Sequence, residues 1–258
     1  MIQMKSCATI KNDIVSFIRC KIQEAGASGA VIGLSGGIDS TLTVYLAVEA
    51  LGADKVLGLL LPEKGITSKQ DIDDARQVAD ILHIDHKVID ISKILSSFSS
   101  VIPDHDKNNF LANGNLKART RMCILYYHAN LMRRMVVGTG NKTELLLGYF
   151  TKYGDGGVDI EPIGCLYKTQ VRALSRHMGV PVHIIDKTPT AGLWPGQTDE
   201  GELGVTYEVA DKILAMLVDE KKELSEVKKI FPAEQVDRLV ALMNTNEHKR
   251  MPPTAPEI

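Results

Sequence analysis

The segment S-G-G-I-D-S at residues 35–40 holds the first residues whose types and spacing could do chemistry. Consecutive glycines let backbone N–H groups converge on an anion, and the N-terminus of a following helix adds free N–H groups and partial positive charge. We therefore predict a phosphate-binding loop. It is not a Walker A loop, because no lysine follows Gly37. A carboxylate at Asp39 beside phosphates indicates a divalent cation between them. The alternative is an ordinary strand-to-helix turn with a capping Ser or Asp.

The elements that must position this loop alternate along the first half of the chain. The apolar run at residues 30–34 predicts a buried strand, and further strands are predicted at residues 55–61, 86–89 and 135–138. Helical periodicity covers residues 10–22, 41–51, 68–82, 92–101 and 115–134, with a polar loop at 103–114. Such alternation is typical of an α/β fold, an open, Rossmann-like parallel sheet with helices on both faces.

The second half of the chain is less regular. Residues 149–165 are glycine-rich, as functional loops often are, and a second long loop begins near residue 188. Helical patterns at 168–178, 206–218, 225–230 and 233–244 predict a helical C-terminal extension. We expect one domain over residues 1–258, built on a single core.

Composition excludes several classes of protein. With 44% hydrophobic and 24% charged residues, the 258-residue chain can bury a full core, which excludes disordered and fibrous proteins. No apolar run approaches the roughly 20 residues that span a bilayer, and no export signal is visible, so we expect a cytoplasmic protein without membrane contact. A balance of 30 basic and 32 acidic residues gives no reason to expect nucleic-acid binding. The four cysteines lack C-x-x-C spacing, which predicts reduced, mostly packed thiols.

Four further segments carry a narrow resemblance to a known family. They are V-V-G-T-G-N-K-T-E-L-L-L-G-Y-F-T-K-Y-G-D-G-G-V-D-I-E-P-I-G at residues 136–164, then L-Y-K-T-Q-V-R, P-T-A-G-L and E-H-K-R. Together with the loop at 35–40 they closely resemble the ammonia-dependent NAD synthetases. That family belongs to the N-type ATP pyrophosphatases, with the adenine nucleotide α-hydrolase-like fold. The match runs in order over most of the chain.

The resemblance implies a reaction and its partners. In this family ATP activates the nicotinate carboxylate of deamido-NAD as an adenylate, and ammonia displaces AMP to give NAD, the last step of NAD biosynthesis. ATP is a co-substrate, Mg²⁺ is the cofactor, and the enzyme is a homodimer. Glutamine-dependent members carry an additional nitrilase-like domain, so we expect free ammonia as the nitrogen donor here.

The resemblance assigns residues to ATP and to the metal. Lys168 serves both as an ATP contact and as the catalytic cation for charge that develops as pyrophosphate leaves. Asp39 and Glu144 fall on the metal positions, and two carboxylates suit an ion that keeps waters and bridges phosphates. The ATP contacts are Gly33, Leu34, Ser35, Gly36, Gly37, Ile38, Asp39, Ser40, Thr139, Lys168 and Thr190. The alternative for Glu144 is a solvent-exposed acidic residue at a helix start. The alternative for Lys168 is a lysine that caps a helix.

The remaining assignments concern deamido-NAD and ammonia. The deamido-NAD contacts implied by the resemblance are Arg119, Lys152, Asp159, His248 and Lys249. For Arg119, a charged helix face is a common alternative. Asp155 falls at the ammonia entry, where a carboxylate could bind ammonium and take its proton.

The loop after residue 190 departs from the family pattern. Many bacterial members carry a longer polar insertion there, so a lid function is not carried over. Trp194 in this loop either covers the bound adenylate or anchors the loop on the core.

Two other functions stay open at this point. A relative that amidates or thiolates a different acceptor would keep the loop at 35–40 but should lack Lys152, Asp159 and the H-K-R tail. A nucleotide sensor without turnover would not need Asp39, Glu144 and Lys168 together.

Overall fold

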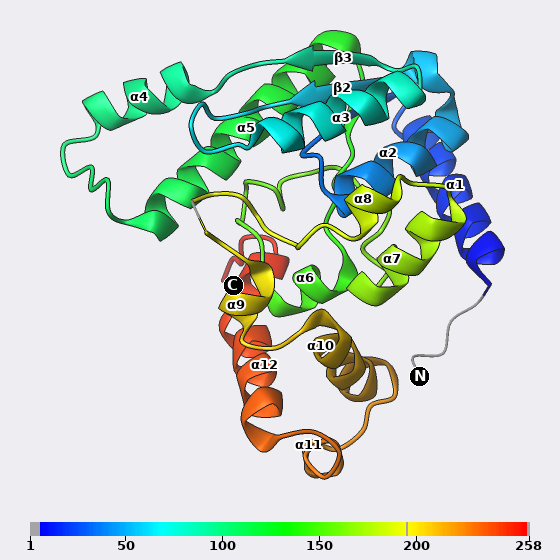
Figure 1. Ribbon diagram of the computed structural model, residues 1–258, viewed down its shortest axis with the longest axis vertical. Helices are drawn as coiled ribbons and strands as arrows, with labels where there is room; N and C mark the ends of the chain where they lie inside the picture. Colours follow the sequence, from blue (N-terminus) through cyan, green and yellow to red (C-terminus); the bar gives the residue numbers. More distant parts are fainter. Residues whose placement is uncertain (1–5, 195, 257–258) are drawn as a thin grey trace.

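The structure, a computed structural model, describes residues 6–194 and 196–256. Its framework is a parallel sheet with the strand order β3-β2-β1-β4 (Figure 1). The strands are β1 (Ala30–Gly33), β2 (Val56–Leu60), β3 (Asp85–Val88) and β4 (Met135–Val136). The chain builds outward from β1 through β2 to β3 and then returns to place β4 on the other side of β1. Ligands of open parallel sheets bind at the carboxyl ends of the strands beside such a reversal.

Helices cover both faces of the sheet, which confirms the predicted α/β fold (Figure 1). One face carries α1 (Cys7–Glu24), α2 (Ile38–Leu51) and α3 (Lys69–Ile81), and the other carries α4 (Ser92–Val101) and α5 (Phe110–Met132). Successive side chains of β1 point to opposite faces of the sheet. Ala30 and Ile32 pack in the core on one face, and Val31 packs in the core on the other.

Local signals in the sequence set several helix ends. The hydroxyl of Ser68 accepts the N–H of Asp71 at 3.0 Å and begins α3. Gly52 ends α2 with a φ of 89°, a conformation that favours glycine. Both ends lie where the sequence pattern predicts them.

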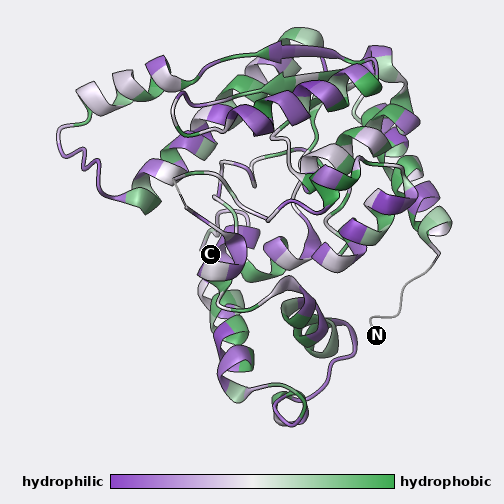
Figure 2. Cartoon of the chain, viewed as in Figure 1, coloured by the Kyte–Doolittle hydropathy of each residue, from purple (hydrophilic) through white to green (hydrophobic). Residues whose placement is uncertain are grey.

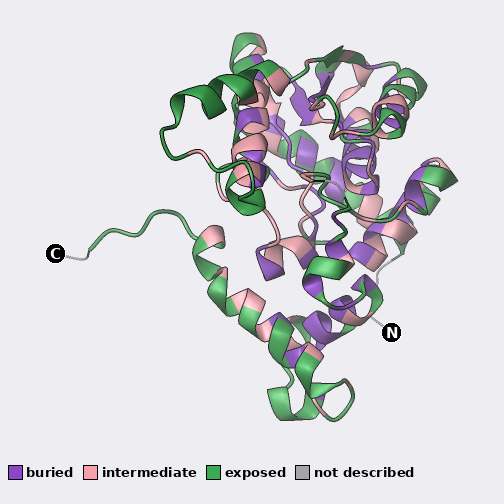
Figure 3. Ribbon diagram, turned by 60° about the vertical axis from the view of Figure 1, so that its left-hand side comes forward, coloured by how far each residue is buried: buried purple, intermediate pink, exposed green. Residues whose placement is uncertain are grey.

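The second half of the chain forms short helices. They are α6 (Lys142–Leu147), α7 (Lys168–His177), α8 (Val182–Ile185), α9 (Asp199–Leu203), α10 (Tyr207–Leu214), α11 (Leu224–Val227), α12 (Ala233–Thr245) and α13 (Glu247–Arg250), with a π-helical turn η2 (Ala215–Asp219) after α10. In the first half, a 3-10 turn η1 (Ala53–Lys55) lies between α2 and β2. Hydrophobic and hydrophilic residues alternate along α12 (Figure 2), and the tail after it runs outward, exposed (Figure 3). Within the described part of the chain, no helix has the length and apolar character needed to cross a membrane.

Some predictions about the fold were wrong. The C-terminal helices have a hydrophobic cluster of their own, which includes Leu147 and Tyr167, so the chain does not have a single core. Helix α5 begins inside the predicted polar loop, because Asn109 caps it by accepting the N–H of Ala112 at 3.0 Å. Gly114 does not break this helix; a Cβ there would lie 3.2 Å from side-chain atoms of Leu193 and Trp194, so its role is close packing.

Helix α6 was not predicted, and the helix expected at 206–218 changes to a π turn after Leu214. The cysteines are free, as expected, but they are not packed inside. Cys20, Cys123 and Cys165 are exposed, and Cys7 is half-buried.

Candidate active site

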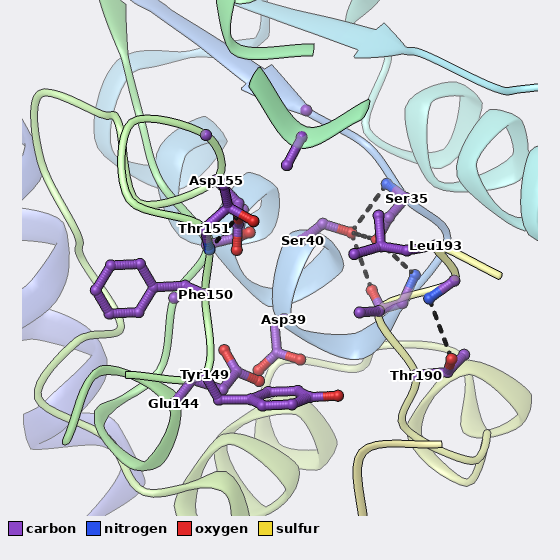
Figure 4. A pocket seen from close by; sticks show the side chains of 18 of the residues that line it. Ser35, Asp39, Ser40, Glu144, Tyr149, Phe150, Thr151, Asp155, Thr190 and Leu193 are labelled. Atoms are coloured by element: carbon purple, nitrogen blue, oxygen red, sulfur yellow. Dashed lines mark hydrogen bonds between the residues drawn. The ribbon is translucent and has the colours of Figure 1, made fainter. Parts of the chain in front are cut away.

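A cavity of about 510 Å³ lies at the carboxyl ends of β1 and β4. Its walls come from the loop after β1, the segment after β4, the irregular segment that begins at residue 148, and the loop before α9. Figure 4 shows side chains from these segments around the cavity. This is the place that the strand order predicts for a ligand.

The loop after β1 is shaped by its own hydrogen bonds. The Oγ atoms of Ser35 and Ser40 lie 3.0 Å apart, and the N–H of Gly37 donates to Ser35 Oγ at 3.2 Å (Figure 4). Gly36 has a φ of 77°, and a Cβ there would lie 2.3 Å from the carbonyl oxygen of Asp71, so only glycine fits. Gly37 is the N-cap of α2 and has no side chain to occupy the first N–H groups of that helix. All eight predicted loop residues except Gly36 line the cavity.

Lys168 lies between two carboxylates. Its Nζ is 2.5 Å from Asp39 Oδ2 and 3.3 Å from Glu144 Oε1, and its side chain is only 2% exposed. The ring of Tyr207 lies 5.0 Å from Nζ. These three charged residues belong to the first turns of α7, α2 and α6, so three helix N-termini surround one spot. An anion placed there would meet both the ammonium and the positive ends of these helices.

The charge states follow from burial and from this pairing. Burial by itself would lower the pKa of the Lys168 ammonium, but Asp39 and Glu144 raise it above its usual value, so Lys168 stays charged. Burial raises the pKa of Glu144. The ammonium of Lys168 opposes this rise only in part, because it lies closer to Asp39 than to Glu144. The cluster is poised to accept a further cation beside Glu144.

Asn141 fixes the two carboxylates relative to each other. Its Nδ2 donates to Asp39 Oδ1 at 3.0 Å, and its Oδ1 accepts the N–H of Glu144 at 3.0 Å. The N–H of Asn141 donates in return to Glu144 Oε2 at 3.2 Å, which completes a capping box at the start of α6. Sequence reasoning did not single out Asn141, although its N-x-x-E spacing to Glu144 is a recognisable capping signal.

The donor chemistry of this pair fits Mg²⁺. Both carboxylates converge on the Nζ of Lys168, and both residues line the cavity. Mg²⁺ is usually held by one or two carboxylates together with waters and substrate phosphates. Among the described residues, no group of three or more His, Cys, Asp or Glu side chains is arranged as a complete metal cage. Phosphate oxygens of a bound nucleotide would have to supply the remaining ligands.

Asp155 and Glu161 are among the further carboxylates that line the cavity. Asp155 Oδ1 accepts the N–H of Thr151 at 2.9 Å (Figure 4), and Glu161 Oε2 accepts the N–H of Gly140 at 2.9 Å. Asp155 lines the cavity. The surrounding protein shields its carboxyl group from bulk water, and this desolvation raises the pKa of Asp155. Burial raises the pKa of Glu161 to about 8. Glu161 was not among the predicted residues; its one signal was an acid within the apolar run D-I-E-P-I-G.

The two predicted threonines come from different segments of the chain. Thr139 follows β4, and Thr190 belongs to the loop before α9; both line the cavity. Thr190 Oγ1 donates to the carbonyl of Gln197 at 2.8 Å, which closes this loop on itself. Trp194 packs against the start of α5, with its ring 6.0 Å from that of Phe110, and also borders the cavity. It therefore anchors the loop at a place from which it can contact a ligand.

Of the five residues assigned to deamido-NAD, Lys249 lines the cavity. Its Nζ donates to the carbonyls of Gly148 at 2.7 Å and Phe150 at 3.0 Å. The others lie outside the cavity lining. Arg119 donates to the carbonyl of Lys152 at 3.3 Å, and Lys152 Nζ donates to the carbonyl of His248 at 2.5 Å, so these three adjoin one another.

Asp159 lies apart from that group. Its Oδ2 accepts the N–H of Val136 at 2.7 Å, and its Oδ1 accepts the hydroxyl of Tyr126 at 3.0 Å. The arginine of α5 that does line the cavity is Arg121, whose Nε donates to the carbonyl of Leu61 at 3.0 Å. The resemblance assigned no role to Arg121, and only its position on the helix could have suggested one.

Comparison with known proteins gives a consistent result over nearly the whole chain. The NAD synthase family model matches residues 10–253. The NH(3)-dependent NAD(+) synthetase of Methanosarcina acetivorans is 53% identical over 250 residues, which cover 96% of this chain and 97% of that protein. Two solved structures are similar at 36% and 31% identity: an NMN synthetase from Francisella tularensis, with a TM-score of 0.89 and coverage of 99% and 100%, and an NH3-dependent NAD synthetase from Campylobacter jejuni, with a TM-score of 0.83 and coverage of 98% and 100%.

Proposed function

The chain belongs to the NAD synthase family, and from this premise we propose that it amidates deamido-NAD with ammonia while ATP is cleaved to AMP and pyrophosphate. One observation carries the proposal: Lys168 is enclosed by Asp39 and Glu144 at the phosphate loop. A sensor that only binds nucleotide has no need of a buried cation held by two carboxylates. The relatives named for ammonia-dependent NAD synthesis favour this acceptor over that of another ATP pyrophosphatase.

The first step activates the acceptor. An oxygen of the nicotinate carboxylate attacks the α-phosphorus of ATP, a P–O bond forms, and the bond to pyrophosphate breaks. Negative charge grows on the departing pyrophosphate. Lys168 and the N-terminus of α2 are fixed in place before the reaction and neutralise that charge without reorganisation.

The second step forms the amide. Ammonia attacks the carbonyl carbon of the acyl adenylate, the C–N bond forms, and the C–O bond to AMP breaks. Asp155 accepts the proton that nitrogen releases, and its raised pKa suits a base that works near neutral pH. Walls from the loop before α9 limit access of water to the adenylate.

Mg²⁺ belongs to this proposal as the cofactor, held by Asp39 and Glu144. When bound, it would supply positive charge that neutralises the phosphates of ATP. Asn141 keeps the two carboxylates at one separation for this purpose.

A homodimer also belongs to the proposal, and α5 supplies the surface. Arg119, Cys123, Tyr127 and Leu131 recur at four-residue spacing and form an exposed stripe on this helix, which we call the α5 stripe. Tyr127 is 66% and Leu131 67% exposed, unusual for large apolar side chains. The stripe ends at Arg119, next to Lys152, so a second copy packed on it would cover these two of the deamido-NAD residues that lie outside the cavity.

The test is a turnover assay with ATP, Mg²⁺ and deamido-NAD that compares ammonium with glutamine and follows NAD and AMP together. Equal amounts of NAD and AMP with ammonium alone are expected. A parallel reaction replaces deamido-NAD with nicotinate mononucleotide, because one similar structure is an NMN synthetase. Amidation of the mononucleotide alone, or AMP without NAD, would contradict the proposed acceptor.

A further inference from the structure

A carboxylate outside the cavity lining is completely buried where α10 meets two other helices. Asp211 has no exposed surface. Its Oδ1 accepts the hydroxyl of Thr143 at 2.5 Å, and its Oδ2 accepts the backbone N–H of Thr169 at 2.8 Å. Thr143 lies in the first turn of α6, and Thr169 lies in the first turn of α7. One side chain of α10 therefore holds the starts of both helices.

The two threonines are direct neighbours of the charged cluster. Thr143 precedes Glu144, and Thr169 follows Lys168. The Thr143 hydroxyl, while donating to Asp211, accepts the backbone N–H of Lys168 at 3.1 Å. A continuous chain of hydrogen bonds thus runs from Asp211 through Thr143 to the backbone of Lys168.

Such a buried charge requires compensation. An uncompensated carboxylate in a protein interior is costly, and the N-terminus of α7, with its free N–H groups and partial positive charge, supplies part of the compensation. Burial raises the pKa of Asp211, while its bonds to Thr143 and Thr169 oppose this shift. The contacts of Asp211 are therefore strong and directional.

A second carboxylate spans the same two helices at the surface. Asp219 lies 2.5 Å from Lys142 Nζ and 2.9 Å from the hydroxyl of Tyr167, and these residues begin α6 and precede α7. Asp219 follows Asp211 by eight residues, and over eight residues of α-helix the direction of the side chain would turn by about 80°. The wider π turn η2 replaces the end of that helix and keeps Asp219 on the same side as Asp211. The Asp219 side chain is 42% exposed, which makes it a matched control for Asp211.

We propose that Asp211 is a positioning residue for the amidation reaction: through Thr143 and Thr169 it fixes the first turns of α6 and α7 and so holds Glu144 and Lys168 at their separation. It contacts neither side chain of that pair directly. A displacement of about 1 Å in a catalytic group can lower the rate about 100-fold. The C-terminal helices therefore act on the chemistry through α10. The expected effect on the reaction rate rests on the proposed function, whereas the hydrogen bonds from Asp211 to α6 and α7 do not.

The test compares Asp211→Asn, Thr143→Val, their double variant, Thr143→Ser and Asp219→Asn with the unchanged protein. The Val side chain keeps the shape of Thr143 but lacks its hydroxyl, and the Asn side chain keeps the shape of Asp211 but lacks the charge and one of its two acceptor oxygens, whereas Ser keeps the hydroxyl. We expect kcat to fall at least 10-fold in Asp211→Asn and Thr143→Val, with KM for ATP within 3-fold. The double variant should be no slower than the slower single one, because both changes break one chain of bonds. Thr143→Ser and Asp219→Asn should keep kcat within 3-fold.

Crystal structures of the unchanged protein and Asp211→Asn give a readout independent of turnover. The proposal expects the first turns of α6 and α7 to separate and the distance from Lys168 Nζ to Glu144 to grow. Unchanged helix positions, an unchanged kcat in folded protein, or a loss confined to KM would overturn it. If Asp211→Asn does not fold, the contrast between Thr143→Val and Thr143→Ser decides instead. Absence of NAD formation by the unchanged protein would count against the proposed function, while the crystallographic comparison would still judge the positioning role.

Discussion

The ammonium of Lys168 lies 2.5 Å from the carboxylate of Asp39, although 129 positions separate the two residues in the sequence. Asp39 comes from the loop after β1, and Lys168 comes from a helix that follows the last strand of the sheet. The pair therefore joins the phosphate loop to the second half of the chain. Its removal should affect chemistry more than folding.

Lys168→Met should lower kcat about 100- to 1,000-fold, because the neutral side chain cannot compensate charge on departing pyrophosphate. Steady-state rates of AMP and NAD formation measure the loss. Lys69→Met is the control, since Lys69 is exposed on α3 and pairs with Asp73. Normal turnover in Lys168→Met would remove this lysine from the mechanism.

Glu144→Gln should lower turnover at least 100-fold at any Mg²⁺ concentration while the fold stays intact. The glutamine can still accept the N–H of Asn141 and keep the start of α6, but it cannot contribute charge to a cation. A magnesium titration of NAD formation, with circular dichroism for the fold, tests this. Undiminished NAD formation at saturating Mg²⁺ would refute the metal assignment.

Lys249→Ala should weaken deamido-NAD binding at least 10-fold and ATP binding less than 3-fold. Lys249 donates to the carbonyls of Gly148 and Phe150 at the cavity wall, and its charge is available to a dinucleotide phosphate. Calorimetric titration of each ligand separates the two effects, with exposed Lys229→Ala as the control. Equal losses for both ligands would mean that the tail shapes the whole cavity instead.

The stability of the ligand-free protein should fall as the pH rises from about 4.5 to about 8. Glu161 has its pKa raised from 4.5 to about 8, so over this range the folded protein holds a proton that the unfolded chain has released. Glu161→Gln cannot ionise, so its melting temperature should fall less over the same range, and the difference in unfolding free energy should reach about 5 kcal/mol, the equivalent of this pKa shift. Exposed Glu234→Gln serves as the control. Parallel curves for Glu161→Gln and the unchanged protein would show that Glu161 ionises normally.

Tyr127→Asp and Leu131→Asp should convert a dimer into monomers, because a charge on the α5 stripe would be buried against the second copy. Light scattering after size-exclusion chromatography gives the mass directly. Ile230→Asp is the matched control, since Ile230 is 62% exposed but lies away from α5, between α11 and α12. The interface assignment fails if the unchanged protein is a monomer or if both α5 variants remain dimeric.

Much of the α/β half could be predicted from the sequence because its signals are local. Apolar runs marked the strands, and Ser68 and Gly52 marked helix ends. The second half was harder, because α6 has only six residues and its start depends on Asn141 and Glu144 together. A six-residue helix shows less than two full turns of periodicity.

The candidate site shows the same division. Residue types and spacing singled out the loop at 35–40, and the resemblance supplied Glu144, Lys168 and Asp155; the structure places these residues around one cavity, and their roles stay predictions. Neither could reveal Asp211, because a buried aspartate and an exposed one look alike in a helical pattern. Its partners lie 68 and 42 positions away. Likewise, spacing alone could not show that Arg121 rather than Arg119 faces the cavity.

The order of segments along the chain has a consequence for synthesis on the ribosome. The sheet is complete at Val136, whereas the buried contact to the starts of α6 and α7 comes from Asp211. A nascent chain can therefore pair all four strands and expose the loop at 35–40 about 75 residues before Asp211 fixes these helix starts. Domains fold largely in the order of their synthesis. A chain truncated between these two points would have the sheet and the loop proposed to bind phosphate, but not the positions of α6 and α7 that we propose for turnover.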